Sequence, residues 1–120
     1  MFLCLAGAIV LSSAATAVDP LAPEEPVTAA GIAYFENHIR PLLIEHCYPC
    51  HSAEHDQREG GLLLDSRPGW QAGGDHGPAI VPGDADASLV VQAVHFADAD
   101  LQMPPDGRLA EDAIRRLRHW

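Results

Sequence analysis

Apolar residues recur every three or four positions in several parts of this chain, and that spacing predicts amphipathic helices. The first pattern begins near residue 29 and runs through Ile32, Phe35, Ile39 and Leu42. Pro41 interrupts it. Because proline cannot donate a backbone hydrogen bond, we expect a kink or a restart there, with Pro41 in the first turn of the second part.

The later patterns predict three shorter helical segments. Asp65 or Ser66 is a start signal for a single turn carrying Trp70, which should stop at Gly73–Gly74. A second helix is expected from residue 87 to about residue 94, capped by Asp84 or Asp86. A third is expected from residue 109 to the end, with acidic residues in its first turn and arginines in its last. Long loops are expected between these helices, at residues 52–61, 77–84 and 96–105.

The beginning of the chain has a different pattern. Residues 2–17 are apolar or small and end in Ala15-Thr16-Ala17, which indicates a signal peptide cut after Ala17 or, alternatively, an uncleaved N-terminal anchor. Cys4 lies within this segment and is interpreted as a small hydrophobic residue. Residues 18–29 contain three prolines and predict a flexible linker, so residues 30–120 form the folded domain. The mature chain is expected in the periplasm or on the outer face of the cytoplasmic membrane.

The length and the net charge of the chain limit the number of domains and the kinds of partner that it can have. The 120 residues have room for one small domain, and 17 acidic against 7 basic residues give a net charge of -10. Such a surface repels nucleic acid and anionic membranes and suits a basic or neutral partner. The N-terminal segment remains a possible membrane tether.

The motif that carries chemistry is Cys47-Tyr48-Pro49-Cys50-His51. Two cysteines three residues apart, followed directly by histidine, are the attachment signature of a c-type haem. On one helical turn both thiols can bond to the haem while the imidazole of His51 binds its iron. A disulfide, a redox-active cysteine pair and a zinc site that adds His55 are the alternatives.

Met103 is the second position singled out. It is the single methionine besides the initiator and lies in a polar segment before Pro104 and Pro105. A thioether held by a rigid loop is better explained as a sixth iron ligand than as a core residue. The competing ligands are His95, then His76, His55, His46 and His38.

Two supporting residues are predicted. An axial histidine donates its second ring N–H to a fixed acceptor, and Pro78, in a proline-constrained loop, offers its carbonyl to His51. Trp70 is expected in the core or the haem wall, and a hydrogen bond from Trp70 or Arg67 to a haem propionate is a further possibility.

These motifs together resemble the planctomycete cytochrome c domain family, a branch of the class I cytochromes c. The resemblance runs from about Tyr34 to Trp120. It rests on Phe35-Glu36, Ile39 to Leu43, His46 to Ser52, Gly61-Leu62, Leu64 to Arg67, Gly73 to Asp75, Gly77 to Gly83, and Leu101 to Pro105 with the closing helix.

The resemblance implies an all-α fold of the class I cytochrome c type, with long loops and with N- and C-terminal helices that cross around a covalently attached haem c. Cys47 and Cys50 would hold that haem, and His51 and Met103 would be its axial ligands. The implied function is electron transfer to a redox partner protein or a fused domain. The alternative is a haem sensor or redox-relay domain that serves a fused catalytic region. The residues show no catalytic arrangement of their own, so the chain is not expected to be an enzyme. One departure is Ala110, which stands where Ser or Thr commonly caps the last helix.

Overall fold

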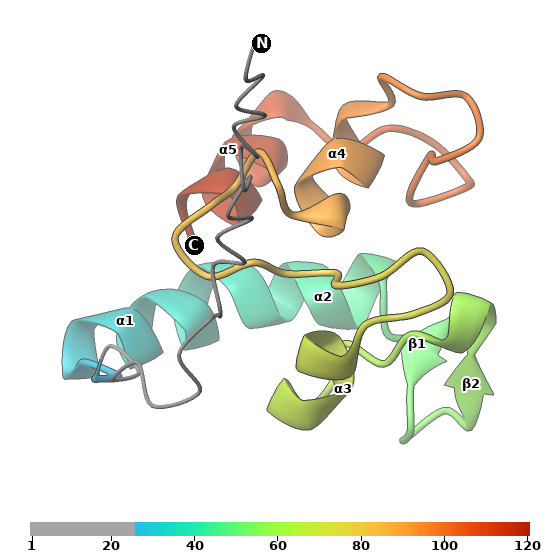
Figure 1. The fold of residues 1–120 in the computed structure, drawn as a ribbon. Helices are drawn as coiled ribbons and strands as arrows, with labels where there is room; N and C mark the ends of the chain where they lie inside the picture. Colours follow the sequence, from blue (N-terminus) through green and yellow to red (C-terminus); the bar gives the residue numbers. More distant parts are fainter. Residues whose placement is uncertain (1–25) are drawn as a thin grey trace, which may run out of the picture.

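The computed structural model describes residues 26–120, in which helices dominate and strands are short (Figure 1). The predicted signal peptide and most of the predicted linker lie outside the described residues. No helix within residues 26–120 has both the length and the apolar character needed to cross a membrane.

The first helical stretch consists of α1 (Ala29–Tyr34), the π-helical segment η1 (Phe35–Ile39) and α2 (Arg40–His46), which follow one another without a break. Thr28 begins it, because its hydroxyl accepts a hydrogen bond from Gly31 N at 3.0 Å. Pro41 lies in the first turn of α2, as predicted. The expected kink is instead a wider turn, since Arg40 N donates to Phe35 O five residues back.

The segment after His51, predicted as a loop, contains a small hairpin. Strands β1 (His51–Ser52) and β2 (Gln57–Arg58) pair antiparallel, with His51 opposite Arg58. A single 3₁₀ turn, η2 (Glu59–Gly61), follows. Two strands of two residues each, joined by a four-residue loop, are too short for an alternating pattern to reveal them in the sequence.

The helix α3 (Arg67–Ala72) confirms its predicted signals. Ser66 is the cap, and its hydroxyl accepts from Gly69 N at 3.2 Å. Gly73 ends the helix with a φ of 72°, and a Cβ there would collide with the carbonyl of Gly77. Only glycine satisfies both constraints at this position.

The two C-terminal helices are α4 (Leu89–His95) and α5 (Glu111–His119). The prediction that α4 starts at residue 87 under an Asp84 or Asp86 cap is wrong. Asp84 accepts from Ala87 N at 3.0 Å, but this bond closes a turn ahead of the helix, and the helix begins after Ser88. Ala110 precedes α5 without a side-chain cap, as its apolar side chain requires.

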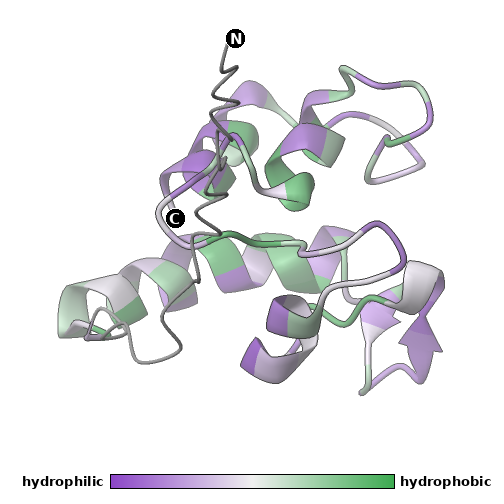
Figure 2. Ribbon diagram, viewed as in Figure 1, coloured by the Kyte–Doolittle hydropathy of each residue, from purple (hydrophilic) through white to green (hydrophobic). Residues whose placement is uncertain are grey.

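The core lies between the first helical stretch and the two C-terminal helices, and Figure 2 shows hydrophobic residues on their facing surfaces. Ile39, Leu43 and Ile114 are its most deeply buried members. The first and last helices are in contact: Tyr34 donates its hydroxyl to Arg116 O at 3.3 Å, and the rings of Phe35 and Trp120 lie 5.3 Å apart. These contacts fix one end of the helix whose other end leads into Cys47.

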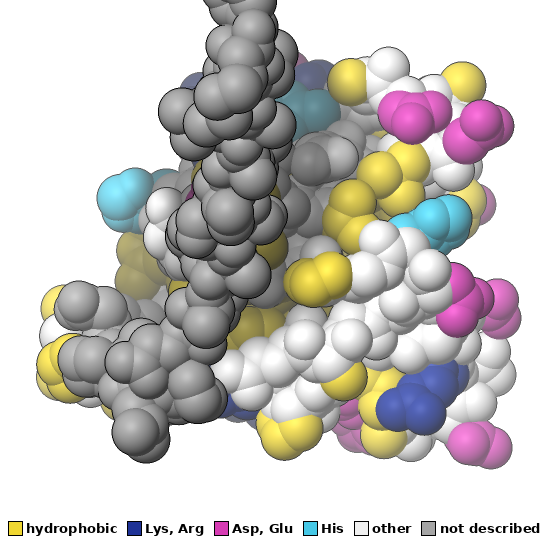
Figure 3. All heavy atoms as spheres, in the orientation of Figure 1, with side chains coloured by type: hydrophobic (Ala, Val, Ile, Leu, Met, Phe, Trp, Pro, Cys, Tyr) yellow, Lys and Arg dark blue, Asp and Glu magenta, His cyan; other side chains and the backbone are white. Residues whose placement is uncertain are grey.

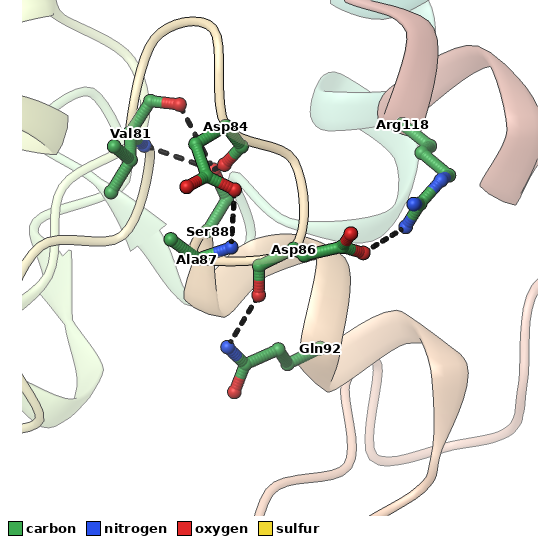
Figure 4. Close-up of polar contacts among 7 residues, drawn as sticks. All are labelled: Val81, Asp84, Asp86, Ala87, Ser88, Gln92 and Arg118. Atoms are coloured by element: carbon green, nitrogen blue, oxygen red, sulfur yellow. Dashed lines mark hydrogen bonds and ion pairs between the residues drawn. The ribbon is translucent and has the colours of Figure 1, made fainter.

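Ser88 is a buried polar residue that the sequence did not single out. It is 4% exposed, and its hydroxyl accepts from Val81 N at 2.9 Å and donates to Asp84 O at 2.8 Å (Figure 4). In the same loop Asp86 pairs with Arg118 of α5 at 2.7 Å, and its carbonyl accepts from Gln92. The loop before α4 is thereby joined to both C-terminal helices.

We predict that Ser88→Ala lowers the free energy of unfolding by about 1–3 kcal/mol, because it removes the buried hydroxyl that bonds to the amide of Val81 and the carbonyl of Asp84. The measurement is chemical denaturation. Gln92→Ala is the control from the same network. Its single bond is exposed, so its effect should stay within about 0.5 kcal/mol. Equal effects of the two substitutions would contradict the role assigned to Ser88.

Candidate functional site

Cys47 to His51 form one closed turn at the end of α2. The amides of Cys47 and Tyr48 both donate to Leu43 O, at 2.9 and 2.8 Å, so the turn grows directly out of the helix. The carbonyl of Cys47 then accepts from Cys50 N at 3.1 Å and from His51 N at 2.9 Å. The two thiols and the imidazole therefore come from a single turn, the local geometry that their spacing predicted.

The two cysteines are free thiols with different surroundings. Cys47 is partly buried and packs against the hydrophobic core, whereas Cys50 is exposed. Burial, with a smaller contribution from nearby Cys50, raises the pKa of the Cys47 thiol to about 11, because a thiolate is poorly solvated there. Cys47 therefore keeps its proton at alkaline pH values at which an exposed thiol has lost it.

Tyr48 anchors the turn from inside. It is 8% exposed and belongs to the hydrophobic core, while its neighbour Pro49 is exposed. Burial raises the pKa of the Tyr48 hydroxyl above its usual value. One side of the turn is therefore fixed in the core, and the other, which carries Cys50, faces solvent.

His51 is oriented by a different residue from the one predicted. Its Nδ1 lies 3.3 Å from the carbonyl oxygen of Leu62, so Leu62 takes the role that the sequence assigned to Pro78. The hairpin is the reason: it returns the chain to the site, and Leu64 N donates to His51 O at 2.9 Å. Pro78 itself is exposed in the loop between α3 and α4.

Two polar residues that the sequence did not assign to the site hold the hairpin next to it. Ser52 is fully buried, and its hydroxyl lies 2.7 Å from His55 Nδ1. Asp65, considered only as a helix cap, accepts from Ala53 N at 2.8 Å instead. The sequence signal was the run Asp65-Ser66, in which two capping residues compete for one helix start and one is left for another role.

Met103 lies on the loop between α4 and α5 and is 40% exposed. Its backbone N donates to Ala93 O at 3.2 Å, which ties this part of the loop to α4. The structure thus attaches Met103 to α4 rather than to the Cys47–His51 turn. Trp70, on α3, is partly buried and packs against the core, as one of its two predicted roles requires.

The competing histidines lie in different surroundings. His95 faces a cavity of about 260 Å³ that Asp86, Gln92 and Arg118 also line, and its buried Nε2 has no hydrogen-bond partner in the described part of the chain. The Nδ1 of His55 contacts the Ser52 hydroxyl, and the Nε2 of His46 lies 3.7 Å from a carboxylate oxygen of Glu45. The ring of His38 packs on the ring of Tyr34, and His76 is exposed.

The metal alternative needs several ligands in one place. Between residues 26 and 120 the structure brings together no group of three or more His, Cys, Asp or Glu side chains that could hold a metal ion. His55, the fourth ligand that the zinc interpretation required, has its Nδ1 on Ser52.

A family model described as Planctomycete cytochrome C matches residues 47–107, about half of the 120-residue chain. The chain belongs to this family. The match starts at Cys47 and includes His51, Leu62 and Met103, whereas Leu43, whose carbonyl accepts from the first two amides of the turn, lies just before it. No curated protein and no solved structure is significantly similar to the chain. Membership of a cytochrome c family indicates haem binding and haem-based electron transfer in general.

The residues present fit a haem. Two free thiols lie on one turn, and the Nδ1 of His51 faces a carbonyl oxygen. This contact favours the tautomer with a proton on Nδ1, which leaves Nε2 as the atom that can bind iron. A carbonyl that holds the second ring nitrogen is the usual companion of a metal-binding histidine.

We predict that the free energy of unfolding of the haem-free chain falls between pH 9 and 11 by about 2–3 kcal/mol more than it does in Cys47→Ala. The folded state keeps the Cys47 proton up to its raised pKa, while the unfolded state loses it near 9, so this contribution is complete below pH 9 and lost as pH rises. Denaturation at several pH values measures it. Cys50→Ala is the control and should keep most of the wild-type slope, because Cys50 makes only the smaller contribution to the raised pKa of Cys47. A slope unaffected by Cys47→Ala would contradict the buried thiol.

Proposed function

We propose that this chain carries one c-type haem, bound through thioethers to Cys47 and Cys50, and transfers electrons with His51 and Met103 as axial ligands. The observation that carries the proposal is the closed turn, in which the carbonyl of Cys47 accepts from the amides of both Cys50 and His51. A disulfide or an isolated thiol pair would not require a histidine on the same turn whose Nδ1 faces a carbonyl oxygen.

The bound iron supplies a one-electron couple, and the chain's residues determine how it is held. The Leu62 carbonyl orients the imidazole and increases its basicity. Tyr48 fixes the turn in the core, so the two cysteines and His51 are positioned before any ligand arrives. Such preorganisation reduces the structural change that accompanies electron transfer.

Met103 is the proposed sixth ligand because it brings a soft thioether on a loop anchored to α4. Histidine–methionine ligation raises the reduction potential, which suits an electron carrier. Its main competitor, His95, lines the cavity shared with Arg118 of α5.

The proposal extends to the fold and the location of the domain. The contact between α5 and the first helical stretch supports a class I cytochrome c arrangement for residues 30–120. We also propose export to the periplasm or the outer face of the membrane, on the strength of the apolar start and its Ala15-Thr16-Ala17 ending.

The redox partner is proposed to be a basic or neutral protein, or a domain fused to this one. The net charge is -10, and the arginines of α5 are paired with acidic residues: Arg115 and Arg116 with Asp112, and Arg118 with Asp86. Figure 3 shows acidic side chains along one edge of the face that it presents. No catalytic activity is proposed for this domain itself.

A haem sensor or redox-relay domain is the second candidate, and the exposure of Met103 is what favours it. A weakly held sixth ligand can be displaced by a small molecule. Rapid carbon monoxide binding to the reduced domain, with loss of thioether ligation, would support this second function. Slow or negligible binding would support electron transfer.

We predict that Met103→Ala loses the spectral signature of thioether ligation and has a lower reduction potential, while the haem remains covalently bound. Absorption spectra and redox titration of the haem-loaded domain measure both effects. His95→Ala is the matched control and should keep the wild-type spectrum. An unchanged spectrum in Met103→Ala, or a changed one in His95→Ala alone, would contradict the ligand assignment.

A further inference from the structure

Asp65 lies where the chain, returning from the hairpin, passes the proposed iron ligand. The carbonyl oxygen of Leu62 lies 3.3 Å from His51 Nδ1, and Leu64 N donates to His51 O at 2.9 Å. Asp65 follows directly, and Ser66 rather than Asp65 caps the helix α3. Asp65 is therefore next to the segment that orients the imidazole, and its side chain is not used for the helix.

One oxygen of the Asp65 carboxylate holds the loop that comes directly after strand β1. Oδ2 accepts from Ala53 N at 2.8 Å and from Glu54 N at 3.4 Å. These two bonds tie the start of the hairpin loop to the returning segment. Asp65 thus fixes the strand that begins with His51 against the segment that supplies the Leu62 carbonyl.

The other carboxylate oxygen, Oδ1, is buried and has no hydrogen-bond partner within residues 26–120. A buried polar atom without a partner costs free energy, and a redox role is one of the reasons for which folded proteins retain such an atom. An asparagine could hold the same two amides through its side-chain oxygen without burying a charge. The property that distinguishes aspartate from asparagine at this position is the negative charge.

The charge of Asp65 acts on the turn that would carry the haem. Tyr48 lies between the two cysteines, and the pKa of its hydroxyl is raised, mainly by burial. Asp65 adds to this rise, while Arg40 opposes it. A negative charge that disfavours the phenolate of Tyr48 also disfavours other negative charge added nearby.

We propose that Asp65 has two functions toward the haem: it positions the segment that orients His51, and its charge lowers the reduction potential. Both functions rest on the proposed haem at the Cys47–His51 turn. Reduction brings one electron from the redox partner to the iron, requires no proton, and makes the charge of the site more negative by one unit. A carboxylate close by makes that step less favourable and so stabilises the oxidised state. Asp65 thereby opposes the rise in potential that a Met103 thioether produces.

The role of the charge is tested with Asp65→Asn in the haem-loaded chain. Asparagine keeps an oxygen for the two amides and removes the charge, so the reduction potential should rise while the absorption spectrum stays that of the wild type. Redox titration measures the shift. Asp56→Asn is the matched control, because it is the same chemical change at an exposed position of the hairpin loop. Its shift should be at most about a third as large and should shrink at high salt, which screens exposed charges more than buried ones. Equal shifts in the two variants, or a fall in the potential of Asp65→Asn, would overturn the role of the charge.

The positioning role is tested with Asp65→Ala, which removes the acceptor as well as the charge. In the reduced haem-loaded chain, the His51 Nδ1 proton should exchange with solvent about tenfold faster than in Asp65→Asn, because the hairpin is no longer held and opens more often. Asp65→Ser keeps a shorter acceptor and should give an intermediate rate. Hydrogen-exchange NMR measures all three. A role of the charge alone would leave the rates equal, so equal rates would overturn the positioning role.

These experiments separate the roles of Asp65 from the proposed function. A wild-type chain without covalent haem would overturn the function itself, before any variant is compared. Covalent haem together with equal potentials in the two asparagine variants and equal exchange rates would overturn the roles of Asp65 alone.

Discussion

Two backbone carbonyls, those of Leu43 and Cys47, determine the geometry of this site. Each accepts two amide hydrogen bonds, and together they turn the end of α2 into a closed loop of five residues. Without the first pair the turn would separate from the helix, and without the second the histidine would not share a turn with both cysteines. Everything proposed about the haem depends on this local arrangement.

The rest of the fold stabilises that turn from three directions. Tyr48 holds it in the core, and the hairpin brings the Leu62 carbonyl to the imidazole. Farther away, α5 packs against the first helical stretch through Tyr34 and Trp120. The loop before α4 in turn connects α4 with α5, because Asp86 accepts from Gln92 and pairs with Arg118. A small domain with a modest core needs such connections, because each buried contact is a large share of its stability.

Local signals in the sequence predicted local structure well. The cap and the end of α3 were correct because a Ser66 hydroxyl and a Gly73 with positive φ act within a few residues of themselves. The start of α4 was wrong because Asp84, a good capping residue, closes the preceding turn instead. A capping residue such as Asp84 predicts that a turn begins nearby, but tertiary packing determines which turn continues into the helix.

The sequence pattern could not predict contacts that the fold makes between separate segments of the chain. The acceptor for His51 is Leu62 rather than Pro78, because a two-residue strand pair returns the chain to the site. Ser52 and Ser88 are buried polar residues whose importance comes from partners in folded loops. A serine in the sequence carries no sign of such a role, whereas Cys47, Cys50 and His51 identify themselves by their spacing.

The central claim is that the turn from Cys47 to His51 holds a haem covalently. Mass spectrometry of the chain, produced with a haem-attachment system, then denatured and extracted with acidic organic solvent, tests it most directly. The account predicts that one haem stays on the chain and that digestion places it on the peptide containing Cys47 and Cys50. A peptide recovered with two free thiols, or with a disulfide between them, would contradict it.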